Sequence, residues 1–569
     1  MLLSSLSILI FAPIYSTVSK KTPQISHDDA FYESLTLHPL PDGRMSVLFE
    51  FETIFSSPGA SGSIPQSHHS LTPPALLLPL AANNVSELTI SFTSGWDQGR
   101  SSAAGLLNFE SSGGGGEIRG WLKDGNDVEQ RWSAVTNALG GLFCAGLGPK
   151  DVGDNVRDFG GIYPPKADFE NATHFLLSHP ESHLCTENLT PFLSLLPSKG
   201  LSGISALLAQ PGIIFSWASQ SEGIEVLMPS PSSNGIGRWK GWWEGVIDLV
   251  PEKGGSRRTS IWKIFNKHIP KPFAEAQTSV LRLIVEDDDM RAEPHGTERE
   301  DWIDGKVRTI VEWDLQDQKV IGGDIEFFWE GENSFQYPRT IDPPPITVTR
   351  TVVDKSASDG TFKIIILNND GYERRAIYSE IWPWWVKGWM SEVYVLVAEE
   401  KRPSAGLLEQ LSYNPSTPPK ISTTTLHFHL TIPASSKLVL RIPFSKLTLK
   451  YTEHRPDAER GIEIPSGVLT LLDTLPESRT PTAKNGGDSE TVNSRRTGRK
   501  RIYTNRLLLD VPTPDFSMPY NVIIMSSTVM AVFFGLMQGA LTRKWGWVEI
   551  APAGKKAKNQ IDVDHIKSE

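Results

Sequence analysis

The stretch MSVLFEFET, residues 45–53, decides the fold class of this chain. Its apolar side chains occupy every second position and alternate with mostly polar ones: Met45, Val47, Phe49 and Phe51 against Ser46, Leu48, Glu50 and Glu52. Successive side chains of a β-strand point to opposite faces, so a period of two predicts a strand with one buried face. Similar alternation recurs at residues 307–313, 393–397, 426–432, 438–442 and 447–451.

These repeated strands predict a mainly β protein with some helix, an α+β class, and β-sandwich architecture in the second half. One helix is predicted over residues 127–139, where Val128, Trp132, Val135 and Leu139 fall at helical spacing before a Gly-Gly stop. Three polar or glycine-rich segments are expected to be loops without fixed structure, residues 56–70, 111–116 and 477–500.

Length and charge exclude several classes of protein. The 569 residues suggest three or four domain-sized units, and an apolar content of 39% excludes a wholly disordered chain. The net charge of −11 argues against nucleic acid as a partner. Two cysteines are too few for a disulfide scaffold or a four-cysteine zinc site.

The two ends of the chain carry targeting signals. Residues 522–541 hold no charged side chain and are long enough to cross a bilayer, and Arg543 and Lys544 follow at once. The positive-inside rule then predicts a single-pass type I protein with a cytosolic C-terminus; a buried helix of a soluble domain is the alternative. Residues 1–19 resemble a cleaved signal peptide, with a buried N-terminal strand as the alternative.

A lumenal body would expose acceptor sequons to glycosylation, which is predicted at Asn84, Asn171 and Asn188. Within the span, Gly535 and Gly539 form a small-xxx-small pattern, and Gln538 is a polar group that would seek a partner in lipid. We expect this helix to pack against others, although incidental glycines in a lone anchor are equally consistent with the pattern.

No catalytic motif is recognisable, and we predict no cofactor and no metal. His179, His183 and Cys185 resemble a metal cluster only superficially, because Pro180 interrupts the helix that such spacing needs. Cys144 lies in an apolar stretch and is expected to be a buried, inert thiol. Cys185 has polar neighbours and is expected to be exposed, so it could bond Cys144 or a cysteine of a partner.

The tryptophan-rich segment 382–389 is interpreted as core combined with a protein contact, because Pro383 and Gly388 discourage an amphipathic helix. His427 and His429, on the polar side of a predicted strand, are interpreted as solvated or hydrogen-bonded side chains.

Several colinear blocks together resemble the PIG-T subunits of the GPI transamidase complex. The most specific block runs from YTNRLL at 503–508 into VPTPDFSMPYNVI at 511–523, where Pro514, Asp515, Phe516, Pro519 and Tyr520 form a juxtamembrane motif. Other blocks lie at 32–36, 88–93, 141–145, 185–191 and 449–453. The chain departs from the family pattern after Trp96 and near Ser56 and Ser111, and the match over 236–345 is faint.

The resemblance implies a non-catalytic scaffold subunit in the endoplasmic-reticulum membrane. Such a subunit stabilises the Cys/His peptidase-like subunit, PIG-K, and helps assemble the site where GPI joins the C-terminus of precursor proteins. The family's partner-bonding cysteine falls on Cys185, which favours an interchain disulfide and leaves Cys144 as a buried free thiol. Other membrane subunits would be further partners, with the GPI lipid and the precursor contacted indirectly.

Two other functions remain open from the sequence. One is a membrane-anchored lumenal cysteine hydrolase that uses Cys185 with His183 or His179, and the other is a type I surface receptor or adhesion protein. The expected division of the chain is a signal peptide at 1–19, an α+β region at 20–235, a middle region at 236–345, a β-sandwich at 346–476, a linker at 477–502, a juxtamembrane segment at 503–521, a transmembrane helix at 522–541 and a cytosolic tail at 542–569.

Overall fold

Strand β2 (Arg44–Ser56) contains the alternating stretch and confirms the predicted strand. Met45, Val47 and Phe49 are fully buried on one face. On its other face Leu48 is also buried, while Glu50 and Glu52 are partly buried and pair with Lys240 and Arg238. The second face of the sheet is therefore charged but largely covered.

A computed structural model describes residues 29–56, 71–95, 111–148, 155–166, 171–180, 184–230, 233, 235–251, 254–303, 306–316, 320–338, 343–397, 400–402, 406–416, 422–450, 453, 461–472, 500–511 and 517–543. The chain divides into two units, Met1–Thr448 with Arg455–Pro512, and Leu449–His454 with Thr513–Glu569. We describe each by itself.

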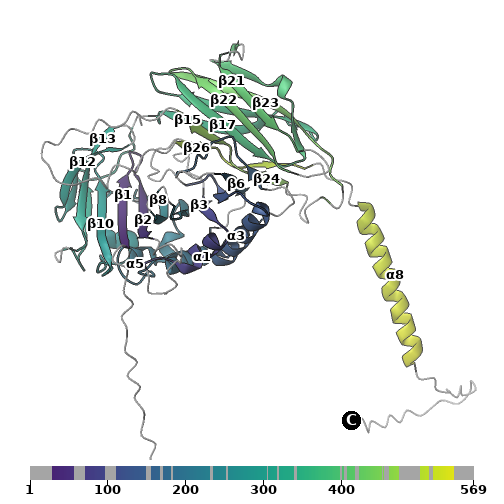
Figure 1. Cartoon of the computed structure of the whole chain (residues 1–569), viewed down its shortest axis with the longest axis horizontal. Helices are drawn as coiled ribbons and strands as arrows, with labels where there is room; N and C mark the ends of the chain where they lie inside the picture. Colours follow the sequence, from purple (N-terminus) through teal and green to yellow (C-terminus); the bar gives the residue numbers. More distant parts are fainter. Residues whose placement is uncertain are drawn as a thin grey trace, which may run out of the picture. The chain divides into compact units, whose positions relative to one another are not determined.

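The first half of the large unit is built on one sheet of eleven described strands, ordered β12-β13-β10-β1-β2-β8-β7-β3-β4-β6-β5 (Figure 1). β1 and β10 run parallel, and the other neighbouring strands are antiparallel. The bounds are β1 (Ala30–Pro39), β3 (Val85–Ser94), β4 (Gly115–Lys123), β5 (Val156–Arg157), β6 (Ala172–His179), β7 (Ser219–Leu227), β8 (Ile236–Asp248), β10 (Ala276–Ile284), β12 (Thr297–Ile303) and β13 (Lys306–Asp314).

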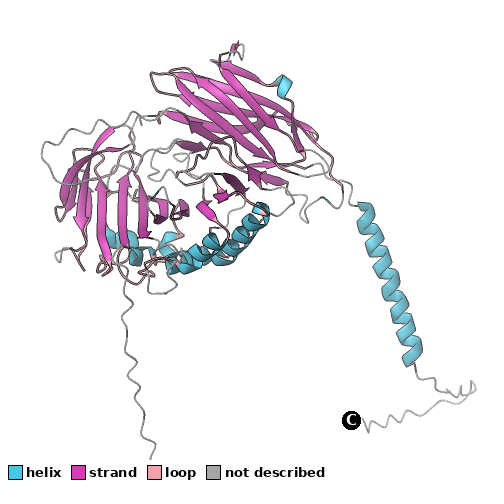
Figure 2. Ribbon diagram, in the orientation of Figure 1, coloured by secondary structure: helices cyan, strands magenta, loops and turns pink. Residues whose placement is uncertain are grey.

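Helices cover the apolar face of this sheet (Figure 2). Trp132, Val135 and Leu139 of α3 are fully buried, which confirms the helix predicted over 127–139. The helices are α1 (Pro74–Ala82), α3 (Val128–Phe143), α4 (Thr186–Leu195), α5 (Ser205–Leu208), α6 (Pro211–Ile214) and α7 (Ile261–Phe265). A small sheet, β11 (Met290–Glu293), β14 (Glu326–Trp329) and β9 (Thr259–Ser260), adds to the same core.

The second half forms the predicted β-sandwich. One sheet contains β15 (Ile346–Val353), β16 (Asp359–Asn368), β23 (Ser436–Lys446), β19 (Tyr394–Val397), β20 (Glu400–Arg402) and β18 (Val386–Gly388). The other contains β21 (Leu408–Asn414), β22 (Thr424–Ile432), β17 (Arg374–Trp382), β25 (Val468–Leu471) and β26 (Arg501–Tyr503). A separate pair joins β24 (Ile462–Ile464) to β27 (Leu507–Leu509).

The tryptophan-rich segment contributes to the core of this sandwich. Phe362 of one sheet stacks on Trp382 of the other at 4.8 Å between ring centroids, and Trp385 is also buried. Trp389 is 50% exposed, and after it comes a short 3-10 helix, η3 (Met390–Glu392). The core interpretation therefore holds for Trp382 and Trp385, while a protein contact at Trp389 stays a prediction.

The structure corrects three sequence-based expectations: one domain boundary, one strand and one loop. β8 lies between β2 and β7, so Ile236 is inside the large sheet and no domain boundary separates 235 from 236. β23 ends at Lys446, and residues 447–450 form no strand. Residues 111–116 are ordered, because Ser111 and Ser112 are buried and β4 begins at Gly115. Residues 57–70 and 473–499 lie outside the described part of the chain.

The small unit contains α8 (Ser517–Thr542), which covers the predicted span. Its stretch Tyr520–Thr542 has 23 residues and a mean hydropathy of 1.8, enough by length and composition to cross a membrane. None of its most apolar window is buried within its own unit. The residues after 543 lie outside the described structure.

Candidate functional site

Cys185 marks the first candidate site because it stands at the start of α4. Its backbone is extended, with φ −147° and ψ 177°, which is the conformation of a helix N-cap residue. On the inner face of the helix, Leu189 and Phe192 are buried in the core. The Cys185 side chain is exposed, as predicted from its polar neighbours, and its thiol forms no disulfide with Cys144.

The Asn188 side chain connects Cys185 to the end of α3. Its amide oxygen accepts hydrogen bonds from the Cys185 backbone N–H at 2.8 Å and from the Cys185 thiol at 3.2 Å. Its amide nitrogen donates to the carbonyl of Phe143 at 2.6 Å. Asn188 is fully buried, and both ends of its amide group are used.

Cys144 follows Phe143 directly and caps α3 in a left-handed conformation, with φ 52°. The Cys144 side chain is exposed, although Ala145 and Leu147 after it are buried in the core. The expectation of a buried thiol is therefore wrong. Two free, exposed cysteines thus lie at the adjoining ends of α3 and α4.

The three predicted sequons differ in their surroundings. Asn84 and Asn171 are exposed and have positive φ angles of 52° and 51°, as in tight turns beside strands. Both remain available as acceptors. A glycan on Asn188 is incompatible with the folded chain, because the amide nitrogen that would carry it is buried and bonded to Phe143. That prediction is corrected.

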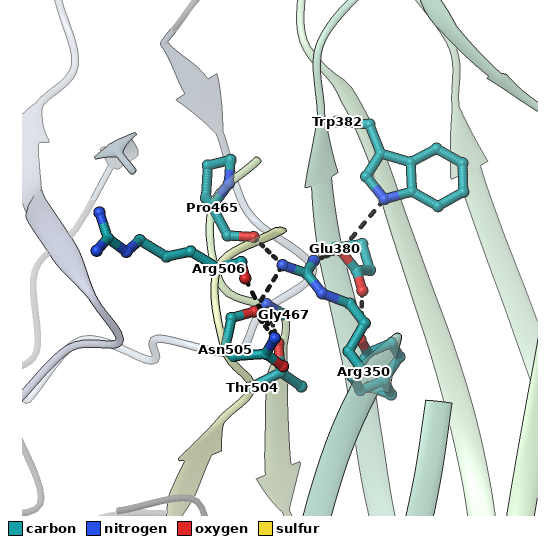
Figure 3. A network of polar contacts seen from close by, with 9 residues as sticks. Arg350, Glu380, Trp382, Pro465, Gly467, Thr504, Asn505 and Arg506 are labelled. Atoms are coloured by element: carbon teal, nitrogen blue, oxygen red, sulfur yellow. Dashed lines mark hydrogen bonds and ion pairs between the residues drawn. The ribbon is translucent and has the colours of Figure 1, made fainter. Parts of the chain in front are cut away.

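The second candidate site is the segment Tyr503–Arg506, which we call the joint segment. Figure 3 shows Arg350 and Glu380, both fully buried in the sandwich, facing this segment. Arg350 Nη1 donates to Glu380 at 2.5 Å, and Nη2 donates to the carbonyls of Pro465 at 2.7 Å and Asn505 at 2.9 Å. A buried charge pair thereby satisfies carbonyls of two chain segments.

The rest of this network fixes the same segment. Tyr378 and Trp382 both donate to the Glu380 carboxylate, the indole nitrogen at 3.2 Å. Thr504 and Gly467 exchange hydrogen bonds, with the Thr504 N–H donating to the Gly467 carbonyl and the Gly467 N–H to the Thr504 hydroxyl, each at 2.9 Å. The joint segment is therefore held by Arg350 of β15 and by Gly467, while Tyr378 and Trp382 of β17 hold the carboxylate that pairs with Arg350.

Arg506 links the joint segment to the first half of the unit. Its guanidinium donates to the carbonyl of Pro180, at the end of β6, and to Glu463 at 3.1 Å. Gly114 leaves the space for this side chain, because an added Cβ would lie 3.0 Å from the Arg506 Nε. At Gly113 an added Cβ would lie 2.6 Å from the Cβ of Ser466. The glycine-rich stretch is thus a close contact between the two halves.

Aromatic and charged side chains complete this contact. The ring of Tyr163 lies between the guanidinium groups of Arg119 and Arg501, 4.6 and 4.8 Å from its centroid. Its hydroxyl is 3.4 Å from that of Tyr503, and burial raises the pKa of Tyr503 to about 12. Both phenols therefore stay neutral at physiological pH.

The predicted histidine roles are settled in part. His427 is buried against Phe159, its Nδ1 lies 2.9 Å from the Ser379 hydroxyl, and burial lowers its pKa to about 4. It is hydrogen-bonded, as expected, and neutral. His183 and the juxtamembrane residues Pro514, Asp515 and Phe516 lie outside the described structure. Within the described residues, no group of three or more His, Cys, Asp or Glu side chains is placed to hold a metal ion.

The membrane-helix residues singled out from the sequence lie on an open helix surface. An added Cβ at Gly535 or Gly539 would meet no atom within 4 Å, and Gln538 is exposed. Tyr520 is 63% exposed near the start of α8, and Pro519 lies in its first turn. Packing of this surface against other helices stays a prediction.

Comparisons with known proteins agree over the length of the chain. A family model described as "Gpi16 subunit, GPI transamidase component" matches residues 13–279 and 251–567. The chain is 28% identical to the human "GPI-anchor transamidase component PIGT" (90% of each chain) and 29% identical to the Schizosaccharomyces pombe "GPI transamidase component PIG-T homolog" (95% of this chain and 94% of that one). It is 26% identical to the Saccharomyces cerevisiae "GPI transamidase component GPI16" (93% and 91%).

Proposed function

Because the chain belongs to the Gpi16 family of GPI transamidase components, we propose that it is the non-catalytic scaffold subunit of that complex in the endoplasmic-reticulum membrane. In this proposal it holds the Cys/His peptidase-like subunit through a disulfide from Cys185. Forming that bond removes two protons and two electrons from two thiols, which pass to a thiol oxidant of the lumen.

The free, exposed thiol of Cys185 on a well-packed helix is the observation that carries the proposal. Its hydrogen-bond partner is the Asn188 amide, which cannot act as the general base that a thiol nucleophile requires. A fixed, accessible thiol of this kind suits a covalent attachment point better than a hydrolase active site. The attachment would raise the effective concentration of the peptidase subunit near membrane-held substrates.

Co-expression of the full-length chain with the peptidase subunit, followed by non-reducing gels, tests the attachment. Cys185→Ser should abolish the covalent adduct, while Cys144→Ser should leave it intact. The comparison is well matched, because both cysteines are free and exposed. Loss of the adduct in Cys144→Ser alone would overturn the assignment, and a hydrolase role would gain support if Cys185→Ser kept the adduct but lost activity.

The proposed topology places the bulk of the chain in the lumen, with a signal peptide at 1–19 and a cytosolic tail after residue 541. The exposed Asn84 and Asn171 support it, since they are accessible to the lumenal glycosylation machinery. Glycosidase treatment should shift the mobility of the wild-type chain, and Asn84→Gln with Asn171→Gln should remove the shift. A glycan on an engineered sequon after residue 560 would contradict the cytosolic tail.

We further propose that α8 packs against other membrane subunits through Gly535, Gln538 and Gly539, and that Pro514, Asp515, Phe516, Pro519 and Tyr520 form the contact at the membrane surface. The open helix surface around both glycines supports this role. Gly535→Ile with Gly539→Ile should reduce recovery of the other membrane subunits in mild detergent. Leu536→Ile, beside the pattern, is the matched control.

A further inference from the structure

Asn188 has the surroundings of a residue that holds Cys185 in place. It is the third residue of α4, it is fully buried, and its amide meets the backbone and thiol of Cys185 on one side and the Phe143 carbonyl on the other. The sequence alone predicts a different role for Asn188, that of a glycan acceptor, because Asn188-Leu189-Thr190 is also a glycosylation sequon.

We propose that Asn188 is the positioning residue of Cys185: its buried amide fixes the exposed thiol at the start of α4 and joins it to the end of α3, beside Cys144. The role of the thiol as the partner attachment point rests on the proposed function above. The positioning itself depends only on contacts within this chain.

Each end of the amide has a separate task. The amide oxygen accepts from the Cys185 backbone N–H and thiol, while the Asn188 backbone N–H donates to the Cys185 carbonyl at 3.0 Å, so the two residues cap the helix reciprocally. The cap sets the direction in which Cys185 leaves the helix. The amide nitrogen satisfies the carbonyl of Phe143, whose ring packs on Phe92 in the core. Movement of Cys185 relative to α3 would break one of these bonds.

Full burial excludes the competing role in the folded protein. A glycan would replace one hydrogen of the same amide nitrogen that donates to Phe143 and would have to leave a fully covered position. By contrast, Thr190 of the sequon is exposed. This difference makes the two roles separable, because Thr190→Ala destroys the sequon and leaves the amide untouched.

The test measures the geometry of the thiols directly in the full-length chain, purified in detergent after mild reduction. With only two cysteines in the sequence, a short bis-maleimide can form one intrachain cross-link, between Cys144 and Cys185. In wild type and Thr190→Ala the cross-link should form at the same rate. In Asn188→Ala it should form about fivefold more slowly, the equilibrium change that loss of one helix cap produces.

Asn188→Asp replaces the amide with a group of nearly the same size, and it provides the same test if Asn188→Ala does not fold. A carboxylate can still accept from the Cys185 N–H but cannot donate to Phe143, so its cross-linking should also slow. Equal rates in wild type and both Asn188 variants would overturn the proposal. A glycan lost equally in Asn188→Ala and Thr190→Ala would also overturn it.

The outcome separates this inference from the proposed function. If wild type forms no covalent adduct with the peptidase subunit but cross-linking depends on Asn188, only the attachment role fails. If the adduct forms in wild type, it should decrease in Asn188→Ala and Asn188→Asp and stay unchanged in Thr190→Ala. An adduct that is insensitive to all three variants would refute the positioning role in the assembled complex.

Discussion

Replacing Arg350 with methionine should release the joint segment Tyr503–Arg506 while the sandwich stays folded. In wild type, Arg350 Nη2 donates to the carbonyls of Pro465 and Asn505, at 2.7 and 2.9 Å. Methionine has a similar length and no donor, so both partly buried carbonyls lose this partner. Opening of the segment then no longer costs these bonds.

The magnitude follows from the kind of bond that is lost. A hydrogen bond to a charged group contributes about 1.5–3 kcal/mol, so two of them lower the opening free energy by about 3 kcal/mol or more. A change of about 1.4 kcal/mol is tenfold in an equilibrium constant, and the open population should therefore rise by roughly 100-fold. The unpaired Glu380 adds a global destabilisation of about 3–5 kcal/mol.

Hydrogen–deuterium exchange of peptides covering residues 500–511 measures the opening in the full-length protein. The reporting amide is that of Thr504, which donates to the Gly467 carbonyl. Arg375→Met is the control, because Arg375 lies on β17 like Glu380 but forms an exposed pair with Glu409. This control should leave the exchange of residues 500–511 unchanged.

A double variant separates anchoring from charge burial. Arg350→Met with Glu380→Leu removes both buried charges and should recover much of the global stability. Exchange of the joint segment should stay fast, since its carbonyls still lack a donor. The reasoning is refuted if the segment in Arg350→Met keeps wild-type exchange, or if the double variant restores its protection.

Three further predictions concern other parts of the large unit. Burial raises the pKa of the Glu222 carboxyl to about 8 from an ordinary 4.5, so the folded state keeps its proton where the unfolded state loses it. The free energy of unfolding should therefore fall as pH rises from about 4.5 to about 8. Glu222→Gln, which cannot titrate, should make the melting temperature less dependent on pH over this range. Gly113→Ala should lower the melting temperature, because its Cβ would lie 2.6 Å from the Cβ of Ser466, whereas Gly141→Ala, with no atom within 4 Å, should not. Phe362→Ala should destabilise the protein by about 3–5 kcal/mol in urea unfolding, since its buried ring stacks on Trp382 and Phe444.

Local patterns in the sequence were enough to predict the elements. The alternation at 45–53 and at 426–432 predicted β2 and β22, and helical spacing predicted α3, because backbone geometry alone sets these periods. The uncharged run at 522–541 likewise predicted α8. Residue chemistry also predicted that the Cys185 side chain is exposed.

Tertiary structure decided which of these elements and side chains meet. β8 completes the sheet of the first half, and Arg350 meets Glu380 and Asn505 from positions far apart in the sequence. The exposure of Cys144 and the burial of Asn188 reverse what their neighbours in sequence suggested. Local sequence fixes the period of a segment, whereas burial and pairing depend on the surface that packs against it, and that surface comes from residues distant in the chain.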